Sequence, residues 1–248
     1  MKVDLGGRVA LVTGGAGGIG RACAKLLAEN GAAITIGDKN LAGAREVCAE
    51  IAATGRDALA VEVDVSSSVA VQGMVDRTIE RFQKIDILVH CAGGSLGRKD
   101  TVDLTDDEWQ TVIRINLDGT MFTTRAVART MIPRRAGTMV MIASDRGLLG
   151  DKGRSAYAAS KGGVIAYAKS LALELGQYEI TVNALNPGTT NSHAIAPGTV
   201  SLRDERLKTD PLGKLSEPED IAEMVLFLGG PAARFMTGQL ITTRMRFG

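Results

Sequence analysis

The stretch VALVTGGAGGIG, residues 9–20, decides the fold of this chain. It begins with a short apolar run of the kind that forms a buried strand. The glycines that follow permit a tight turn and a close approach of the backbone before a helix begins. Free N–H groups and the positive end of the helix dipole meet at such a turn, which makes it a site for a pyrophosphate. The stretch therefore predicts a dinucleotide-binding βαβ unit.

The same alternation of short apolar runs and longer helical patterns continues along the chain. The runs are rich in Val and Ile, which is typical of parallel strands covered on both faces. We expect strands at residues 9–12, 33–37, 58–63, 85–89, 138–143, 180–185 and 239–243, and helices at 21–30, 41–53, 69–82, 106–132, 156–175 and 219–228. This order predicts an α/β chain, a single-domain Rossmann fold over residues 1–248: a doubly wound, seven-stranded parallel sheet with helices on both faces.

Two helix caps and one long irregular stretch complete this outline. Capping boxes, in which a hydroxyl residue is followed three positions later by Glu, are expected at Thr105 with Glu108 and at Ser216 with Glu219. The longest irregular stretch, residues 186–215, follows the sixth expected strand. Because ligands bind outside the carboxyl ends of such strands, we interpret this stretch as a substrate loop.

Composition and charge exclude several classes of protein. The 248 residues carry 29 Lys and Arg against 28 Asp and Glu, which argues against binding to the phosphate backbone of a nucleic acid. The three cysteines are widely spaced and suit neither a disulfide framework nor a metal site. The N-terminus lacks the pattern of a secretion signal, and no apolar run is long enough to span a membrane. We therefore expect a cytoplasmic protein that binds neither membranes nor nucleic acids.

An acidic residue follows the second expected strand. Asp38 comes 18 residues after Gly20, where a carboxylate accepts hydrogen bonds from the adenosine ribose hydroxyls. A carboxylate in this place repels the 2′-phosphate of NADP, and the glycine loop contains no Arg or Lys to bind that phosphate. Lys39 partly offsets the repulsion. We expect NAD as the cofactor, with NADP as the alternative.

Tyr157 is the one of three tyrosines that has a lysine, Lys161, four residues later in a stretch of helical pattern. Residues four apart share one helix face, so the ammonium group is expected near the phenol. We expect this charge to lower the pKa of Tyr157 and to bring the phenol within reach of acid–base chemistry. Ser144, thirteen residues upstream, closes the fifth expected strand at the edge where ligands bind.

In this combination the chain resembles the compact branch of the short-chain dehydrogenase/reductase family over nearly its whole length. Thr13-Gly14-x-x-x-Gly18-x-Gly20 is similar to the family's cofactor loop, and Ser144, Tyr157 and Lys161 are similar to its catalytic core. The resemblance places Asn116 on the family's catalytic Asn. It extends the expected cofactor site to Ile19, Asp64, Val65, Ala92, Gly93, Pro187, Gly188 and Ser192.

The sequence departs from the family pattern after the fourth expected strand and at its end. His90-Cys91-Ala92-Gly93 stands where the family has Asn-Asn-Ala-Gly, and we interpret His90 as a packed residue at a strand end rather than a tuned group. Thr243-Arg244-Met245-Arg246 replaces the family's Asp-Gly-Gly. This replacement puts in question the packing of the tail against a neighbouring subunit that is frequent in the family.

The resemblance implies reversible oxidation of a secondary alcohol to a ketone by hydride transfer to NAD. Tyr157 is then the general acid/base, Lys161 lowers its pKa and holds the nicotinamide ribose, and Ser144 orients the substrate oxygen. Asn116 holds a water of the proton relay. The alternatives are an NADPH-dependent reductase of 3-oxoacyl thioesters and, outside the enzymes, a dinucleotide-binding sensor or scaffold. The resemblance also implies a homotetramer or a homodimer.

A cluster of basic residues bears on the identity of the substrate. Three basic residues cluster between the serine and the tyrosine: Arg146, Lys152 and Arg154. We hypothesise that they attract a carboxylate or a coenzyme A phosphate; the alternative is a solvated basic rim beside Asp145 and Asp151. His193 is interpreted as a residue of the substrate loop, either structural or facing the substrate.

Overall fold

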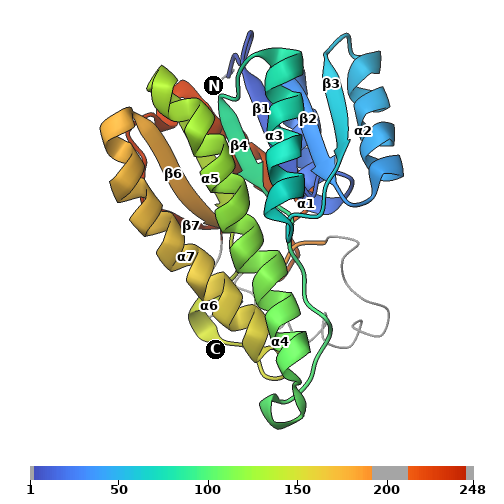
Figure 1. Ribbon diagram of the computed structural model, residues 1–248, viewed down its shortest axis with the longest axis vertical. Helices are drawn as coiled ribbons and strands as arrows, with labels where there is room; N and C mark the ends of the chain where they lie inside the picture. The colour runs from blue at the N-terminus through green and yellow to red at the C-terminus, as the bar shows by residue number, and fades with distance from the viewer. Residues whose placement is uncertain (1–2, 192–211, 244–248) are drawn as a thin grey trace.

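The computed structural model describes residues 3–191 and 212–243 (Figure 1). Within them, parallel strands form one sheet in the order β3-β2-β1-β4-β5-β6-β7. The strands are β1 Val9–Thr13, β2 Ala33–Asp38, β3 Ala58–Glu62, β4 Ile87–His90, β5 Gly137–Ile142, β6 Ile180–Asn186 and β7 Leu240–Thr242. The predicted Rossmann class and the seven-stranded parallel sheet are confirmed.

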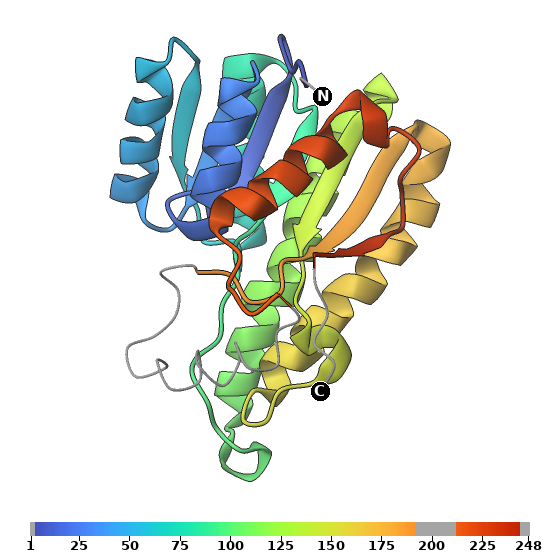
Figure 2. The ribbon, with the colours of Figure 1, turned by 180° about the vertical axis from the view of Figure 1, so that it is seen from behind.

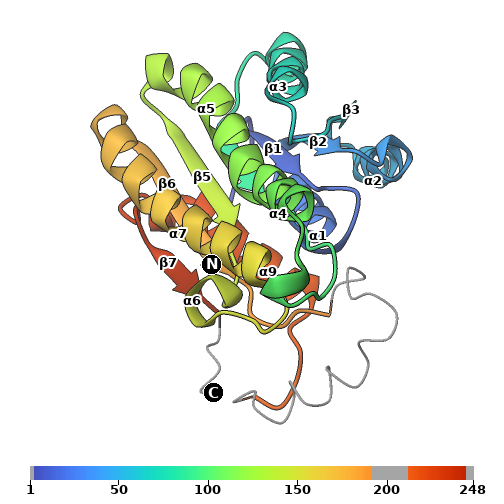
Figure 3. The same cartoon turned by 60° about the horizontal axis from the view of Figure 1, so that its bottom comes forward.

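Helices cover the sheet in two layers. One face carries α1, α2 and α9, and the other carries α3, α5 and α7 (Figures 1 and 2). Figure 3 shows the sheet between these layers, with α4 and α6 beyond its carboxyl edge. None of the helices in the described residues has the length and apolar character needed to cross a bilayer. The bounds are α1 Gly18–Glu29, α2 Leu41–Ala53, α3 Ser68–Phe82, α4 Asp106–Ile113, α5 Gly119–Met131, α6 Arg146–Leu149, α7 Ser155–Leu175 and α9 Pro218–Gly229.

Successive strand residues enter opposite hydrophobic cores because side chains alternate along a strand. In β1, Val12 packs into the core beneath α1 and α9, whereas Leu11 packs into the core beneath α3 and α7. In β4, Val89 and Leu88 divide in the same way. Complete burial of each such side chain stabilises the fold by about 1.5–3 kcal/mol. Both faces of the strands are therefore apolar, as the continuous Val- and Ile-rich runs predicted.

The order of the strands reverses direction at β1, which pairs with β2 on one side and with β4 on the other. In such sheets the crevice outside the carboxyl ends at the reversal point is where ligands bind. Thr13 at the end of β1 lies directly opposite His90 at the end of β4. The loops that follow these two residues, which contain Gly14 and Cys91, therefore begin side by side.

The expected helix over residues 106–132 forms as two α-helices joined by a π-helical segment. Arg114–Asp118 is this segment, between α4 and α5, and the three run on as one rod in Figure 1. A π-helical turn holds one extra residue, and such turns are frequent at functional sites. Asn116 lies within it and is fully buried. The pattern of apolar residues does not reveal this interruption because helical spacing continues on both sides of it.

The structure corrects one predicted helix cap, confirms the other and adds one short helix. The cap of α9 is Glu217, which forms a reciprocal capping box with Asp220, instead of the expected Ser216 with Glu219. The hydroxyl of Ser216 donates instead to the carbonyl of Thr189 at 3.2 Å. The short helix α6 at Arg146–Leu149 was not predicted, because a single turn is too short to show apolar periodicity. The box of Thr105 and Glu108 is confirmed.

Candidate active site

A cavity of about 660 Å³ opens at the carboxyl edge of the sheet. This volume is in the range of small-molecule and cofactor sites. Nearly all of the residues that the sequence singled out line it, although they come from segments far apart in the chain. They are Gly14, Gly18, Ile19, Gly20, Asp38, Asp64, Val65, Ala92, Gly93, Ser144, Arg146, Arg154, Tyr157, Lys161, Pro187 and Gly188.

One end of the cavity is acidic. The carboxylate of Asp38 accepts the backbone N–H of Ala16 at 3.0 Å and that of Asn40 at 2.9 Å. These bonds hold the charge at the carboxyl end of β2 and tie it to the glycine loop. Asp64 accepts the hydroxyl and the N–H of Ser66, and these hydrogen bonds lower the pKa of its carboxyl group. Both acids are therefore fixed as hydrogen-bond acceptors on the cavity wall.

The glycine loop has the shape that a bound pyrophosphate requires. Gly14 has a φ of +67°, and a Cβ there would lie 2.8 Å from the backbone nitrogen of Ala92. A Cβ on Gly20 would overlap the carbonyl of Gly14. By contrast, a Cβ on Gly17 would meet no atom within 4 Å, because this glycine faces the open cavity beside the start of α1. The loop can thus present backbone N–H groups to an anion, and it fits a dinucleotide.

The side chain of Asn116 holds the loop after β4. Its amide nitrogen donates to the carbonyl of Gly94 at 2.8 Å, and its amide oxygen accepts the N–H of the same residue at 3.1 Å. The nitrogen also donates to the carbonyl of Val112 at 2.9 Å. A Cβ on Gly93 would lie 2.6 Å from the Asn116 oxygen and 3.4 Å from the Nζ of Lys161. Asn116 does not itself line the cavity; in this structure it positions the residues that do.

Ser144 and Tyr157 stand together on the opposite end of the cavity. Ser144 follows β5, its hydroxyl donates to Asp145 at 3.2 Å, and it accepts the N–H of Arg146 at 3.2 Å. Tyr157 lies in the first turn of α7. Burial raises the pKa of its phenol, while a hydrogen bond with Ser144 and the charge of Arg154 act to lower it. The net shift is upward, so the phenol is protonated at neutral pH.

This direction corrects the expectation that Lys161 lowers the pKa of Tyr157. The Nζ of Lys161 lies 5.9 Å from the centroid of the Tyr157 ring and donates to the carbonyl of Ile142 at 2.7 Å. Burial lowers the pKa of Lys161 itself to about 8. The desolvation that acts on the phenol therefore outweighs the positive charges around it. Sequence spacing places the two groups on one helix face but says nothing about how deeply the phenol is buried.

A family model described as enoyl-(acyl carrier protein) reductase matches residues 14–243. The chain belongs to the short-chain dehydrogenase/reductase family. It is 39% identical over 240 residues to the (2S)-[(R)-hydroxy(phenyl)methyl]succinyl-CoA dehydrogenase subunit BbsD of Thauera aromatica, covering 94% of each chain. It is 36% identical over 241 residues to the 3-oxoacyl-[acyl-carrier-protein] reductase FabG of Chlamydia pneumoniae, covering 97% of each chain.

Two further similarities widen the range of relatives. The chain is 36% identical over 234 residues to the cis-4-hydroxycyclohexanecarboxylate dehydrogenase of Sinomonas cyclohexanicum, covering 94% of each chain. Among solved structures, that of gox2181 superposes with a TM-score of 0.94 at 36% identity, covering 97% of this chain and 95% of the other. The short-chain dehydrogenase/reductase family thus contains relatives of similar length that are named for quite different alcohols and ketones.

Where the family has Asn, this short-chain dehydrogenase/reductase has His90, and the structure shows what the ring contacts. His90 is buried at the end of β4, and its Nδ1 lies 2.9 Å from Oγ1 of Thr13. Its Nε2 is buried without a hydrogen-bond partner among the described residues. Burial and then the charge of Lys161 lower the pKa of the ring to about 3, so it is neutral. The interpretation of His90 as a packed strand-end residue agrees with these contacts.

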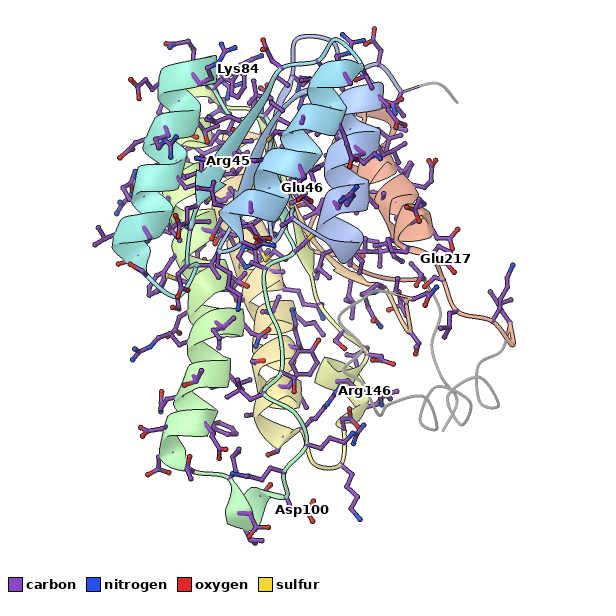
Figure 4. All side chains as sticks on the ribbon, turned by 90° about the vertical axis from the view of Figure 1, so that its right-hand side faces the viewer. Arg45, Glu46, Lys84, Asp100, Arg146 and Glu217 are labelled. Atoms are coloured by element: carbon purple, nitrogen blue, oxygen red, sulfur yellow. The ribbon has the colours of Figure 1, made fainter. Side chains whose placement is uncertain are left out.

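Within the described residues, two of the three basic residues predicted beyond Ser144, Arg146 and Arg154 but not Lys152, form ion pairs with two buried carboxylates. Arg146 lies beyond the carboxyl edge of the sheet, on α6 (Figure 4). Its Nε is 3.4 Å from Asp145 and 3.5 Å from Asp151, and Nη1 of Arg154 is 3.8 Å from Asp151. Arg146 and Arg154 line the cavity, so they are not a solvated rim only.

Some site predictions fall outside the described residues, and some lining residues were not predicted. Ser192, His193 and much of the expected substrate loop lie outside them. Cys91 and Thr190 line the cavity although nothing in their residue type marked them. Their sequence positions were the available signal, because Cys91 immediately precedes Ala92 and Thr190 follows Gly188 by two residues.

Proposed function

We propose that this protein is an NAD(H)-dependent oxidoreductase that interconverts a secondary alcohol and a ketone. The observation that carries the proposal is the placement of Ser144, Tyr157 and Lys161 along one cavity whose other end is formed by the glycine loop and Asp38. An alcohol beside the phenol would lie in the same enclosure as a dinucleotide held by the loop. When bound, the nicotinamide would accept or supply the hydride.

The residues of the chain would handle the proton. In ketone reduction, the O–H of Tyr157 would donate its proton to the developing alkoxide, and Ser144 would hold the same oxygen by a hydrogen bond. In alcohol oxidation, the phenolate of Tyr157 would take the hydroxyl proton as the C–H bond gives up its electron pair. With its raised pKa, Tyr157 is at neutral pH in the acid form that ketone reduction uses.

Lys161 and Asn116 would act on either side of this proton transfer. The buried ammonium of Lys161 is fixed by the carbonyl of Ile142, within reach of a ribose hydroxyl placed in the cavity. Asn116 would fix the loop at Gly93 against which the cofactor rests. The water that the family resemblance assigns to Asn116 stays a prediction, because its side-chain amide is bonded to Gly94 and Val112.

Asp38 supports NAD over NADP as the cofactor. Its carboxylate is anchored by two backbone N–H groups and cannot turn away from the cavity without losing both. A 2′-phosphate would face this fixed negative charge, whereas a 2′-hydroxyl would donate to it. Lys39 lines the same end of the cavity and would reduce the repulsion, so NADP remains the alternative cofactor.

The second candidate is a reductase of 3-oxoacyl thioesters, and the similarity to FabG favours it. The similarity to BbsD, which is named as a dehydrogenase of a hydroxyacyl coenzyme A, points to the same kind of substrate. A cis-4-hydroxycyclohexanecarboxylate dehydrogenase at 36% identity favours a free ring acid instead. These substrates share a secondary hydroxyl or keto group, which is the chemistry that we propose for Tyr157.

One panel tests the proposal. Initial rates are measured with NAD and NADP at equal concentration on cyclic alcohols, polyols, hydroxy acids and hydroxyacyl thioesters, and with the reduced cofactors on the corresponding ketones. We expect turnover of at least one secondary alcohol with NAD, and its loss in Tyr157→Phe. Tight dinucleotide binding with no turnover of any compound would favour the sensor or scaffold instead. Sedimentation on the same samples tests the expected homotetramer or homodimer.

A further inference from the structure

Five charged side chains meet at the end of the cavity beyond Ser144. Asp151 lies between three arginines: Arg98 at 3.1 Å, Arg146 at 3.5 Å and Arg154 at 3.8 Å. Asp145 is the second carboxylate, 3.4 Å from Arg146. Both acids are more than nine-tenths buried on their side chains, and the arginines outnumber them by three to two. One positive charge of this group is therefore left without a carboxylate.

The hydrogen-bond donors of the three arginines are used unequally. Arg98 donates to Asp151 at 3.1 Å and 3.4 Å and also to the carbonyl of Lys152. The side chains of Arg146 and Arg154 contact the carboxylates but donate no hydrogen bond to any of the described residues. The Nε of Arg154 is in addition buried without a partner among those residues. Buried donors in native proteins normally have an acceptor, so the Nε of Arg154 marks this arginine as lacking one within the described part of the chain.

The two arginines with unused donors are those that face the cavity. Arg146 and Arg154 line it together with Tyr157, whereas Arg98 does not. Their exposed side-chain fractions are 16% and 23%, so solvent screens them only partly. Their charges reach the phenol of Tyr157, where burial raises the pKa and Arg154 and Arg146 act to lower it. An acceptor bound between them would lie in the same cavity as the phenol of Tyr157.

The cavity is thus polarised along its length. Asp38 and Asp64 outnumber Lys39 at the end where the glycine loop begins, and the two arginines outnumber Asp145 at the end where Ser144 and Tyr157 stand. A dinucleotide held by the loop would leave the basic end to the substrate. The planar guanidinium fork matches a carboxylate with paired N–H···O bonds.

We propose that Arg154 and Arg146 form a carboxylate-binding subsite. The substrate is then a hydroxy acid or a keto acid. Its carboxylate lies on these two side chains, and its hydroxyl or keto oxygen meets Tyr157 and Ser144. This inference rests on the proposed oxidoreductase function and names its substrate class. The phosphates of coenzyme A lie at the far end of a long pantetheine arm from the reacting carbon. They would not reach guanidinium groups beside Tyr157, so a carboxylate near the reacting group is the acceptor that fits.

The test compares matched substrates on matched variants. The substrates are 4-hydroxycyclohexanecarboxylate, its methyl ester and cyclohexanol, each with saturating NAD. The variants are Arg154→Gln, Arg146→Gln and the control Arg98→Gln. The control removes a third cation from Asp151, and its side chain is not part of the cavity lining. The readout is the ratio of kcat/KM for the acid to kcat/KM for the ester, because any change in Tyr157 affects both compounds equally.

We expect the native enzyme to prefer the acid over the ester by at least about 10-fold. Arg154→Gln is expected to lower this ratio by about 10- to 100-fold, the effect of losing a charge-assisted hydrogen bond, with most of the change in KM for the acid. Arg146→Gln should act in the same direction, and Arg98→Gln should change the ratio by less than about 2-fold. Equal use of acid and ester, or an equal effect of all three variants, would overturn the subsite.

A binding measurement keeps this inference separate from the proposed function. Cyclohexanecarboxylate, which has no hydroxyl to oxidise, is titrated into the protein saturated with NADH, and its methyl ester is the comparison. We expect the acid to bind, and its affinity to fall about 10-fold or more in Arg154→Gln but not in Arg98→Gln. Turnover of neutral alcohols without carboxylate binding would leave the oxidoreductase and remove the subsite. Carboxylate binding without turnover of any alcohol would support the subsite and contradict the proposed oxidoreductase function.

Discussion

Thr13 and His90 are opposite each other on paired strands, and a 2.9 Å hydrogen bond joins Oγ1 of Thr13 and Nδ1 of His90. The same hydroxyl accepts the N–H of Ala92 at 3.3 Å. The ends of β1 and β4 are thereby tied together where the glycine loop and the loop at Gly93 begin. A histidine in this place therefore connects the stability of the fold to the geometry of the cofactor site.

This relationship predicts a pH dependence of stability. His90 has a pKa of about 3 in the fold and about 6.5 when unfolded, so below pH 6.5 the unfolded chain binds a proton that the folded chain does not. Stability therefore falls as the pH is lowered, by about 2 kcal/mol between pH 7 and pH 5 from this group. Urea denaturation at the two pH values checks it. In His90→Asn this part of the decrease should vanish; an unchanged decrease would show that another group causes it.

The raised pKa of Tyr157 predicts how the two directions of the reaction depend on pH. Reduction needs the phenol and should stay high through neutral pH, whereas oxidation needs the phenolate and should rise with pH toward 10 and beyond. Rates in both directions from pH 6 to 10.5 measure this. Tyr157→Phe should lower both by about 10²- to 10⁴-fold while dinucleotide binding persists. An oxidation rate that is already maximal at pH 7 would contradict a Tyr157 phenol that is protonated at neutral pH.

Asp38 should determine the choice between the two dinucleotides. We expect Asp38→Ser to weaken NAD binding by about 10- to 100-fold, because a charged hydrogen-bond acceptor is lost, and to strengthen NADP binding as the repulsion disappears. Asp64→Asn is the comparison, since its side chain lines the same end but follows β3 rather than β2. It should weaken both dinucleotides similarly. Fluorescence titration with the reduced cofactors gives the affinities, and an unchanged preference in Asp38→Ser would refute this role.

Gly93 and Gly94 are neighbours that should respond differently to the same substitution. A Cβ on Gly93 would press on Asn116 at 2.6 Å and lie 3.4 Å from the Nζ of Lys161, whereas one on Gly94 would meet nothing within 4 Å. We expect Gly93→Ala to lower the free energy of unfolding by about 1–3 kcal/mol and to weaken dinucleotide binding. Gly94→Ala should alter both much less. Equal behaviour of the two variants would show that Asn116 does not position this loop.

Cys91 lines the cavity and should report its occupancy. We expect iodoacetamide to modify Cys91 more slowly when a dinucleotide is bound, because this residue belongs to the cavity wall that the cofactor would cover. Cys48 serves as the internal comparison because it does not line the cavity, and burial raises its pKa to about 11. Mass spectrometry of digested protein follows the two thiols separately. Equal protection of both would indicate a general stabilisation of the fold instead of a ligand over Cys91.

Much of the fold and part of the site could be predicted from the sequence because the signals are local. A buried parallel strand requires a continuous apolar run, and a turn such as that at Gly14 requires a residue that tolerates a φ of +67°. The helical spacing of Tyr157 and Lys161 places both on one face of α7 wherever the helix packs. These inferences depend on neighbours in the chain, and the structure agrees with them.

Other properties depend on which segments meet in space. Whether Tyr157 has a raised or a lowered pKa is decided by the burial of its phenol against the charges around it, and spacing from Lys161 alone led to the wrong direction. The arginines around Asp151 come from separate parts of the chain, and only the packing shows that Arg98 donates to its carboxylate while Arg146 and Arg154 also line the cavity. The sequence by itself determined the sheet, the glycine loop and the residue types of the site, because backbone conformation and apolar burial are encoded locally. The tertiary structure decided the direction of the pKa shift of the Tyr157 phenol, and which arginine donates to Asp151 and which arginines line the cavity. Desolvation and charge pairing act through space, between residues that are distant in the chain.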